Sequence, residues 1–473
     1  MKKRKKTGMP PCTDMGNAEF FAELYKDKLC YDHKNQRWLV WRKHWWSEDS
    51  TQEIVQLAKY ATRHRFRNTF AIDDDDLRKE ELNWARTSEM RSRLEATVIL
   101  ARSETHLARR GTEWDTDPWL LGVANGVVDL KTGSLRRGLP SDGITMHTRV
   151  AFQRSANAPL WDEFLKDVFV DDELIDFLQH AVGYSLTGQT SEQCFFACFG
   201  DGANGKSTFL ETVRYVFDEY AHNTPFSTLE LLGRSSIPAD LAELDGRRFV
   251  TAIETNNSVR LNEARLKGLT GSDAVTARRL YKGFFTFTPV AKFWLAFNHK
   301  PSVRDDSYGF WRRNRLIPFT QIFLGDSQNK ELLATLRTEA PGILAWAVRG
   351  CLKWQAEGLG LPSSVRAATE QYREESDPLR DFIDELCIVQ PGKSVAASAL
   401  WVTYLNWVKD NGEPWPLDRA AFARRLEARG LRKTRVGHAR TWTWEGICLK
   451  QGHKLGLLTS QADVRTDADG QIQ

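Results

Sequence analysis

The sequence predicts an α/β core that is preceded by a mainly helical domain and followed by a small winged-helix-like module. Three patterns predict this fold class. An apolar run at 194–199 leads into a glycine-rich turn and then an amphipathic helix, and strands and helices keep alternating from 151 to about 325. Helical periodicity dominates residues 13 to about 110, and two helical stretches near the C-terminus precede a short pair of strands.

Length and composition set the first limits. The chain has 473 residues, about three times the roughly 150 of a typical domain, with 41% hydrophobic and 27% charged residues. These values exclude a small single module and a wholly disordered chain. No run of about 18 apolar residues occurs, and the basic start MKKRKKTGMPPC has no apolar stretch behind it, so we expect a cytoplasmic protein without a membrane partner.

Changes of pattern divide the chain into six expected segments. They are a basic tail (1–12), a mainly helical N-terminal domain (13–150), an α/β domain (151–325), a helical segment (326–388), a winged-helix-like module (389–450) and a flexible tail (451–473). Asn125-Gly126 and Thr132-Gly133 are typical of hairpin turns, and the four aspartates at 73–76 are typical of a helix start.

The most specific motif is the glycine-rich turn at 200–207, GDGANGKS, which fits the phosphate-loop pattern G-x-x-x-x-G-K-[ST] between a strand and a helix. Small residues let successive backbone N–H groups surround a phosphate at a helix N-terminus. We therefore expect ATP and Mg²⁺, with Lys206 on the β- and γ-phosphates and the Ser207 hydroxyl on the metal. The expected nucleotide contacts are Gly200, Asp201, Gly202, Ala203, Asn204, Gly205, Lys206, Ser207 and Thr208.

Polar residues at later strand ends complete a catalytic hypothesis. Glu254 ends the apolar run FVTAIE, where a carboxylate can hold Mg²⁺ or its water and polarise the attacking water. Asn298 ends FWLAFN, where an amide can contact the γ-phosphate, although an Asn before a turn is also common. Arg312, Arg313 and Arg315 precede another strand, and an arginine can stabilise the charge of a phosphoryl transition state; surface salt bridging is the alternative for at least one of them.

Two stretches are expected to bind nucleic acid. The segment between the expected β-strands that end in Glu254 and Asn298 contains interleaved basic and aromatic residues, which suit single-stranded nucleic acid. Phe284 and Phe285 are nevertheless expected to pack in a core. Residues 393–450 hold 11 Lys/Arg against 5 Asp/Glu, a net +6, whereas the whole chain carries +4. A basic helix there with its following strand pair predicts DNA contacts, and a merely solvated basic helix is the alternative. The candidate contacts are Arg278, Arg279, Tyr281, Lys282, Arg424, Arg425, Arg429, Lys433, Arg435 and Arg440.

The order of these motifs resembles that of the superfamily 3 helicases of the AAA+ class, specifically the helicase part of the phage, plasmid and poxvirus-type primase-helicases. GDGANGKST, VTAIETN, KGLTGSDAVTARRLYKG, FWLAFNHKP and FWRRNRLIPF follow one another as the family's motifs do. The resemblance implies an AAA+ P-loop ATPase core, Asn298 as the sensor, Arg313 as the arginine finger with Arg312 as an alternative, and Lys282 as the residue that grips DNA, with Arg278 or Arg279 as alternatives. Many relatives have two adjacent acids where Glu254 is followed by Thr255, so Glu254 is expected to serve both metal and water.

The resemblance predicts an ATP-driven helicase that acts as a homo-oligomer, expected to be a hexamer, on single-stranded or forked DNA during replication of a phage or mobile element. The expected location is then the host cytoplasm or a viral replication site. No primase domain is expected within these residues, so a separate primase or polymerase is an expected partner. Two other functions use the same loop: a P-loop ATPase switch that binds DNA without unwinding it, and a small-molecule kinase. The kinase leaves Asn298, the arginines and the basic C-terminal stretch without a role.

Overall fold

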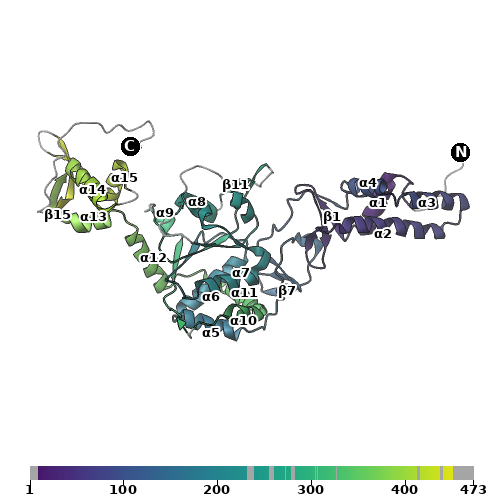
Figure 1. Ribbon diagram of the computed structural model, residues 1–473, viewed down its shortest axis with the longest axis horizontal. Helices are drawn as coiled ribbons and strands as arrows, with labels where there is room; N and C mark the ends of the chain where they lie inside the picture. The colour runs from purple at the N-terminus through teal and green to yellow at the C-terminus, as the bar shows by residue number, and fades with distance from the viewer. Residues whose placement is uncertain are drawn as a thin grey trace. The chain divides into compact units, whose positions relative to one another are not determined.

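The computed structural model (Figure 1) describes residues 9–231, 239–254, 260–271, 273–278, 283–303, 305, 307–325, 328–412, 416–436 and 440–450. Contacts divide the chain into two units. The first holds residues 1–302 and 307–369, and the second holds 303–306 and 370–473.

The first unit begins with helices packed on a small sheet. Its elements are α1 (Asp14–Tyr25), β1 (Leu29–Asp32), β2 (Arg37–Trp41), β3 (Trp46–Glu48), α2 (Glu53–Asn68), α3 (Asp75–Thr87), α4 (Arg91–Ala101) and β4 (Ala108–Arg109). The strands lie in the order β3-β2-β1-β4. Asp74 caps α3, because its side chain accepts hydrogen bonds from the backbone N–H groups of Asp76 and Leu77. The aspartate run at 73–76 therefore starts a helix, as its sequence predicted.

A three-stranded antiparallel sheet follows, formed by β5 (Leu120–Val123), β6 (Gly126–Asp129) and β7 (Ser134–Arg136). Both turns fall at the expected dipeptides. Val123 pairs with Gly126 across the first turn, and Asp129 pairs with Ser134 across the second.

The central sheet has five strands, all parallel, in the order β14-β8-β13-β10-β9. They are β8 (Phe195–Phe199), β9 (Ala221–Asn223), β10 (Phe249–Ile253), β13 (Lys292–Phe297) and β14 (Asn314–Pro318). Every residue of β13 is buried, as expected for an inner strand of a parallel sheet covered on both faces. The short hairpin of β11 (Val275–Arg278) and β12 (Phe284–Phe287) lies between β10 and β13 in the sequence.

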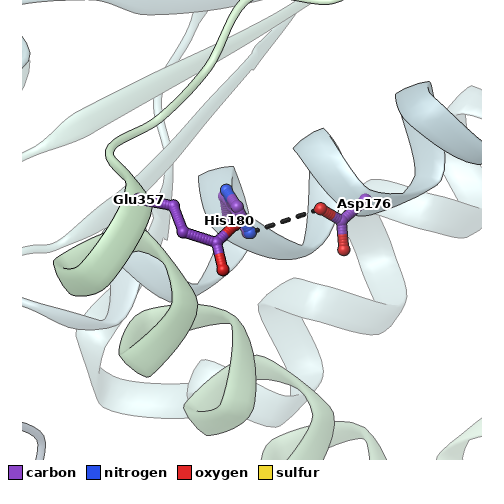
Figure 2. A group of neighbouring side chains, drawn as sticks. All are labelled: Asp176, His180 and Glu357. Atoms are coloured by element: carbon purple, nitrogen blue, oxygen red, sulfur yellow. Dashed lines mark ion pairs between the residues drawn. The ribbon is translucent and has the colours of Figure 1, made fainter.

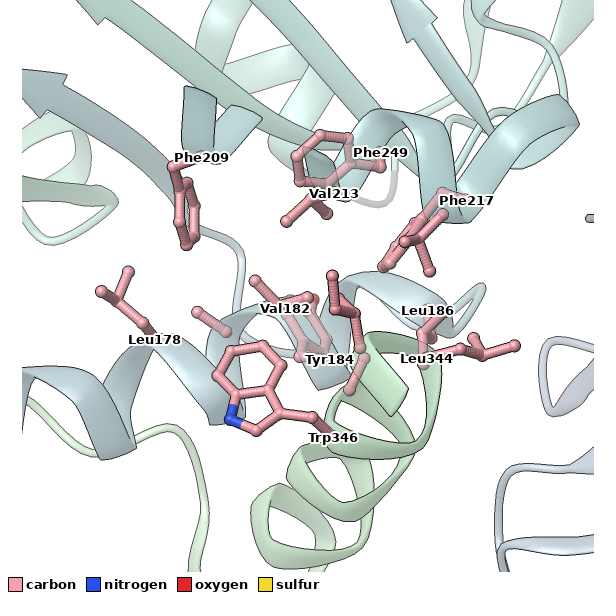
Figure 3. Packing of buried hydrophobic residues seen from close by; sticks show 14 of the residues in the cluster. Leu178, Val182, Tyr184, Leu186, Phe209, Val213, Phe217, Phe249, Leu344 and Trp346 are labelled. Carbon is pink, nitrogen blue, oxygen red and sulfur yellow. The ribbon is translucent and has the colours of Figure 1, made fainter. Parts of the chain in front are cut away.

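Helices provide the core that holds this sheet. They are α5 (Pro159–Val168), α6 (Asp172–Leu186), α7 (Lys206–Phe217), α8 (Glu263–Thr270), α9 (Tyr308–Trp311), α10 (Leu332–Thr338) and α11 (Ala340–Glu357). Figure 3 shows side chains of α7 facing those of α6 and α11, with Phe209 and Val213 above Leu178 and Val182. Trp161 of α5 stacks on Phe209 with ring centroids 5.6 Å apart. The helix that follows the glycine-rich turn is thus fixed from below by a continuous apolar layer.

The second unit has its own core. After α12 (Ser363–Glu375), which spans the division between the units, come α13 (Arg380–Leu386), β15 (Cys387–Ala396), α14 (Ala397–Asn411), α15 (Arg419–Ala428), β16 (Arg432–Val436) and β17 (Thr441–Leu449). The sheet order is β15-β17-β16. Phe382 of α13 packs against Tyr404 of α14 and Phe422 of α15. Helix α13 thus belongs to the same unit as the basic helix and the strand pair, although the sequence pattern places it in the preceding segment, 326–388.

The molecule is a mixed α/β protein with a helical N-terminal region. Among the described residues, none of the helices combines the length and the apolar character needed to cross a bilayer.

Candidate nucleotide-binding site and nucleic-acid surfaces

The glycine-rich turn leaves the carboxyl end of β8 and ends where α7 begins. Two of its glycines are required by geometry. Gly205, the N-cap of α7, has φ +86°, and a Cβ there would lie 2.8 Å from Val168 Cγ2. Gly200 has φ +150°, and a Cβ there would lie 2.2 Å from the carbonyl oxygen of Phe319. The turn is therefore both left-handed in places and too closely packed for side chains at these positions.

Lys206 is buried, with only 6% of its surface exposed, and lies over the inside of the turn. Its Nζ donates hydrogen bonds to the Gly200 carbonyl at 2.5 Å, the Asp201 carbonyl at 3.0 Å and Asn204 Oδ1 at 3.0 Å. Burial lowers the pKa of this ammonium. The lysine is thus held by oxygens that phosphate oxygens can replace. The two residues that follow it, exposed Ser207 and half-buried Thr208, carry hydroxyls.

The segment after β14 holds the turn from the side. Phe319 N donates to the Phe199 carbonyl at 2.7 Å, and Phe323 N donates to the Ala203 carbonyl at 2.8 Å. The buried Asn204 donates from Nδ2 to the Phe319 carbonyl at 3.3 Å. Asn204, predicted as a nucleotide contact, therefore also links the turn to this segment.

Glu254 and Asn298 lie at the same edge of the sheet as the turn. Phe297 pairs with Phe199 in parallel strands, so Asn298 and Gly200 each follow one member of a registered pair. Ile253 pairs with Ala296, which brings Glu254 to that edge as well, and Glu254 N donates to the Ala296 carbonyl at 2.9 Å. Strand β10 is separated from β8 by β13, so Asn298, and not Glu254, follows the strand that directly neighbours the loop strand.

The Glu254 carboxylate is half-buried, and its Oε1 has no hydrogen-bond partner among the residues that the structure describes. Burial raises the pKa of Glu254, His299 opposes that rise, and the charge of Glu230 adds to it. An orphaned, partly desolvated carboxylate oxygen fits a cation or a polarised water. Together with the exposed Ser207 hydroxyl, this donor set suits Mg²⁺, which prefers oxygen ligands.

Two residues near this edge were not singled out by the sequence. The Glu230 carboxylate lies close enough to Glu254 to perturb it, and it is half-buried. Lys300 places its Nζ 4.9 Å from the centre of the Phe199 ring, at the last residue of the loop strand. Lys300 follows Asn298 in the run NHKP, a sequence cue for a second cation at this edge, whereas nothing local distinguishes Glu230 from other surface glutamates.

Arg312, Arg313 and Arg315 lie near the amino ends of the parallel strands, opposite the ends that carry the turn. The Arg313 carbonyl accepts a hydrogen bond from Phe195 N, at the amino end of β8. Arg313 also donates from Nη1 to the Gly309 carbonyl at 2.6 Å, and Arg312 donates from Nη2 to Gln193 Oε1 at 2.8 Å. Arg315 donates to the Arg312 carbonyl at 2.5 Å, which is a local contact. The trio is therefore not brought to the phosphate loop of its own chain.

The β11–β12 hairpin exposes part of the basic and aromatic cluster. Arg278 pairs with Phe284, and its guanidinium lies 5.6 Å from the centre of that ring. Phe284 is 64% exposed, so the expectation that it packs in a core is wrong, because its position in the hairpin turns it outward. Arg279, Tyr281 and Lys282 lie outside the described residues.

The basic residues of the second unit fall into two groups. Arg424, Lys433 and Arg435 are exposed, and Lys433 and Arg435 lie 5.3 and 4.5 Å from the centre of the Trp442 ring. Arg440 is exposed as well.

The second group consists of Arg425 and Arg429, which the sequence predicts to contact DNA together with Arg424. Arg425 is buried and its Nη1 lies 3.7 Å from Asp377 Oδ1, and Arg429 donates to Asp377 Oδ2. The buried Arg425 therefore packs inside the unit, which corrects its predicted role at the DNA surface, whereas Arg429 is exposed and stays a candidate contact. Helical spacing alone does not say which arginine faces inward.

Comparison with known proteins gives two matching families. Residues 18–170 match the family described as "D5 N terminal like", and residues 198–313 match a family of unknown function, DUF5906. "Putative helicase L207/L206" of Acanthamoeba polyphaga mimivirus is 27% identical over 83% of this chain and 45% of its own length. "Putative helicase 022R" of Frog virus 3 is 23% identical over 63% of this chain and 39% of its own length. "Putative primase C962R" of African swine fever virus (isolate Tick/Malawi/Lil 20-1/1983) is 27% identical over 63% and 34%.

These matches confirm the resemblance carried by the motif order: this mixed α/β chain is similar to phage and viral primase-helicases. Its relatives are named helicases or primases, and the chain spans less than half the length of each relative given above. Among solved structures, the apo C-terminal region of NrS-1 is similar with a TM-score of 0.48 and 12% identity, over 87% of this chain and 85% of that one.

Proposed function

We propose that the protein is an ATP-driven DNA helicase of the AAA+ class that acts in replication of a phage or other mobile element. The observation that carries this proposal is the gathering of Lys206, Glu254 and Asn298 at one edge of the central sheet. A phosphate loop, a carboxylate and an amide at one edge are the groups that nucleotide hydrolysis needs.

The strand order supports the AAA+ assignment. In β14-β8-β13-β10-β9, the strand that ends in Asn298 lies between the loop strand and the strand that ends in Glu254. An amide inserted between loop and carboxylate can sense the γ-phosphate and orient the water that attacks it. A small-molecule kinase would need an acceptor site beside the γ-phosphate and has no use for the exposed basic residues of the second unit.

The residues divide the work by their chemistry. Lys206 exchanges the loop carbonyls for β- and γ-phosphate oxygens, and the N-terminus of α7 adds its partial positive charge. Ser207 and Glu254 would hold Mg²⁺, which neutralises phosphate charge when bound. Glu254, partly desolvated, accepts the proton of the attacking water, and Glu230 beside it favours the protonated product.

The position of Arg312 and Arg313 implies a role in the site of a second subunit. From Phe195 to Phe199 strand β8 rises about 13 Å at roughly 3.3 Å per residue, and Arg313 lies at the far end of that rise from the loop. An arginine so placed can complete only a neighbour's site. We therefore propose a ring, expected to be a hexamer, in which Arg313, or Arg312 beside it, reaches the γ-phosphate of the next subunit.

DNA contacts complete the proposal. The second unit runs α13-β15-α14-α15-β16-β17 with the sheet order β15-β17-β16, the order of a winged helix, in which α15 is the helix for the groove and β16–β17 is the wing. Arg424, Lys433 and Arg435 are among its exposed cations. The β11–β12 hairpin, with Arg278 and exposed Phe284, suits the backbone and bases of a single strand.

A strand-displacement assay tests the proposal. Forked DNA with a labelled strand is incubated with the protein, Mg²⁺ and ATP, with the Lys206→Ala variant as control. ATP-dependent release of the labelled strand by the wild type alone supports a helicase. Hydrolysis stimulated by DNA without strand release would favour an ATPase switch and reject unwinding.

A further inference from the structure

A buried histidine and two carboxylates meet where α6 and α11 pack together, a cluster that the proposed ATPase chemistry does not use. Asp176 and His180 lie four residues apart on α6, and Glu357 is the last residue of α11. One donor atom from each lies within 4.8 Å of the others (Figure 2). Figure 2 shows the imidazole between the two carboxylates.

Close contact between the helices creates this cluster. A Cβ at Gly183 would lie 2.1 Å from Cys351 N, and a Cβ at Gly350 would lie 2.0 Å from the Gln179 carbonyl oxygen. With no side chain at either glycine, the helix backbones approach directly, and His180 reaches the C-terminal end of α11. That helix end carries a partial negative charge, which favours a cation.

The hydrogen bonding of His180 leaves one nitrogen for a ligand. The side chain is 6% exposed, and its Nδ1 lies 3.2 Å from the Gly358 carbonyl oxygen. A carbonyl can only accept, so Nδ1 carries the proton, and Nε2 offers its lone pair to a ligand when the ring is neutral. Nε2 is buried, has no hydrogen-bond partner among the described residues and points toward Asp176 Oδ2 at 3.4 Å. Metal-bound histidines commonly donate the ring N–H opposite the metal to a backbone carbonyl, as Nδ1 does here, and Nε2 is the nitrogen that faces the Asp176 carboxylate.

The carboxylates have room to complete such a site. Asp176 uses Oδ1 to accept a hydrogen bond from Lys353 Nζ at 2.5 Å, which orients the group and leaves Oδ2 facing His180. Asp176 is 48% exposed and Glu357 is exposed, so small rotations can bring their oxygens to the roughly 3.4 Å spacing that a tetrahedral ion with about 2.1 Å bonds requires. Water can fill the remaining positions from the exposed side.

We propose that Asp176, His180 and Glu357 bind a divalent transition-metal ion, with Zn²⁺ as the best match to one imidazole nitrogen and two carboxylate oxygens. With a neutral imidazole, the two carboxylates and Lys353 give the cluster a net charge of −1. A bound divalent ion changes this net charge to +1. The bound ion ties α6, which leads into the loop strand β8, to the end of α11. This site is separate in its residues from the Mg²⁺ site proposed for Ser207 and Glu254.

The test measures Zn²⁺ binding to the full chain, without a histidine tag and without nucleotide, by titration calorimetry. The variants Asp176→Asn, His180→Gln and Glu357→Gln each remove one donor, and His64→Gln changes an exposed histidine of α2 as the matched control. Circular dichroism checks the fold of each variant. Because the chain has seven cysteines, Co²⁺ is bound in parallel, since a thiolate-to-cobalt absorption band would reveal sulfur ligands.

We expect one Zn²⁺ per wild-type chain, affinity lower by at least about tenfold in each of the three variants and unchanged in His64→Gln, and no sulfur band with Co²⁺. Zn²⁺ should also raise the Tm of the wild type and not that of Glu357→Gln. Equal Zn²⁺ affinity in wild type and Glu357→Gln would overturn the proposal, because this exposed helix-end substitution leaves the fold intact. A sulfur band would overturn it too. Neither result depends on ATPase or helicase activity.

Discussion

Arg313 and Lys206 lie near opposite ends of strand β8. The Arg313 carbonyl accepts from Phe195 N at 2.9 Å, where β8 begins, whereas Lys206 starts the helix that follows the turn at the end of β8. The Arg313 guanidinium, which donates to the Gly309 carbonyl, is therefore not positioned at a phosphate held by Lys206 of the same chain. If both residues serve hydrolysis, they do so from different subunits.

This separation predicts rescue by mixing. Arg313→Ala should lower the ATPase rate by on the order of 10³-fold, as removal of other arginine fingers does. Mixing inactive Arg313→Ala with inactive Lys206→Ala should restore part of the activity once subunits exchange, because some interfaces then pair an intact loop with an intact arginine. Arg315→Ala is the control, since that side chain bonds locally to the Arg312 carbonyl. No recovery despite demonstrated exchange would count against a finger in trans, and normal activity of Arg313→Ala would transfer the role to Arg312.

Lys206→Ala should abolish ATPase activity. The substitution removes the one side chain that bonds Gly200, Asp201 and Asn204 within the turn, and with it the cation for the β- and γ-phosphates. Phosphate release and binding of a fluorescent ATP analogue measure the effect. Lys166→Ala, an exposed position on α5, is the matched control. Turnover near that of the wild type would reject the assignment of the phosphate loop.

Glu254→Gln should bind ATP but hydrolyse it about 10²- to 10⁴-fold more slowly, because the amide keeps the shape and loses the basicity. The wild type should also lose activity in acid at a higher pH than an ordinary glutamate would dictate. Burial raises the pKa of Glu254, the ionised form is the active base, and activity therefore falls as the pH drops through a value above the usual ~4.3. The pH dependence of kcat, with folding monitored in parallel, tests this. Loss of ATP binding by Glu254→Gln would instead assign the residue mainly to the metal or to structure.

Phe284→Ala should weaken binding of single-stranded DNA by about 1 to 3 kcal/mol and leave basal ATPase activity unchanged, because an exposed ring on a hairpin can stack on bases. Arg278→Ala, which removes the cation beside that ring, should act in the same direction. Fluorescence anisotropy with labelled DNA measures both. Phe70→Ala is the control, since that ring is 69% exposed elsewhere in the first unit. Unchanged affinity in both hairpin variants would place the DNA grip elsewhere, with Lys282 the next residue to test.

The neighbouring residues Arg424 and Arg425 should separate DNA binding from stability. Arg424→Gln should lower duplex affinity and reduce the slope of log affinity against log salt by about one, because it removes one phosphate contact. Arg425→Gln should cost on the order of 1 to 3 kcal/mol of stability, since it leaves Asp377 with one partner fewer in a partly buried pair. Chemical denaturation and salt-dependent DNA binding distinguish the two. The reverse pattern would mean that α15 presents its other face to DNA.

The sequence by itself determined the features that depend on local chemistry. The turn at 200–207 can be recognised from the sequence because phosphate binding needs glycine conformations and a lysine at fixed spacing. The hairpin turns at Asn125-Gly126 and Thr132-Gly133 can be recognised because few dipeptides adopt such turns. The aspartate run at 73–76 can be recognised as a helix start because the first backbone N–H groups of a helix need hydrogen-bond acceptors. The order of motifs was enough to predict the resemblance to viral helicases and primases that the comparisons confirm.

Only the tertiary structure decided what depends on which strands and helices become neighbours. It placed β13 between β8 and β10, turned Phe284 outward, directed Arg425 to Asp377, and put α13 in the same unit as the basic helix. It also brought Glu230 near Glu254, and His180 of α6 to Glu357 of α11, across 177 positions in the chain. Such pairs leave no local pattern, because long-range contacts are set by packing of whole elements, here by two glycines that let two helices touch.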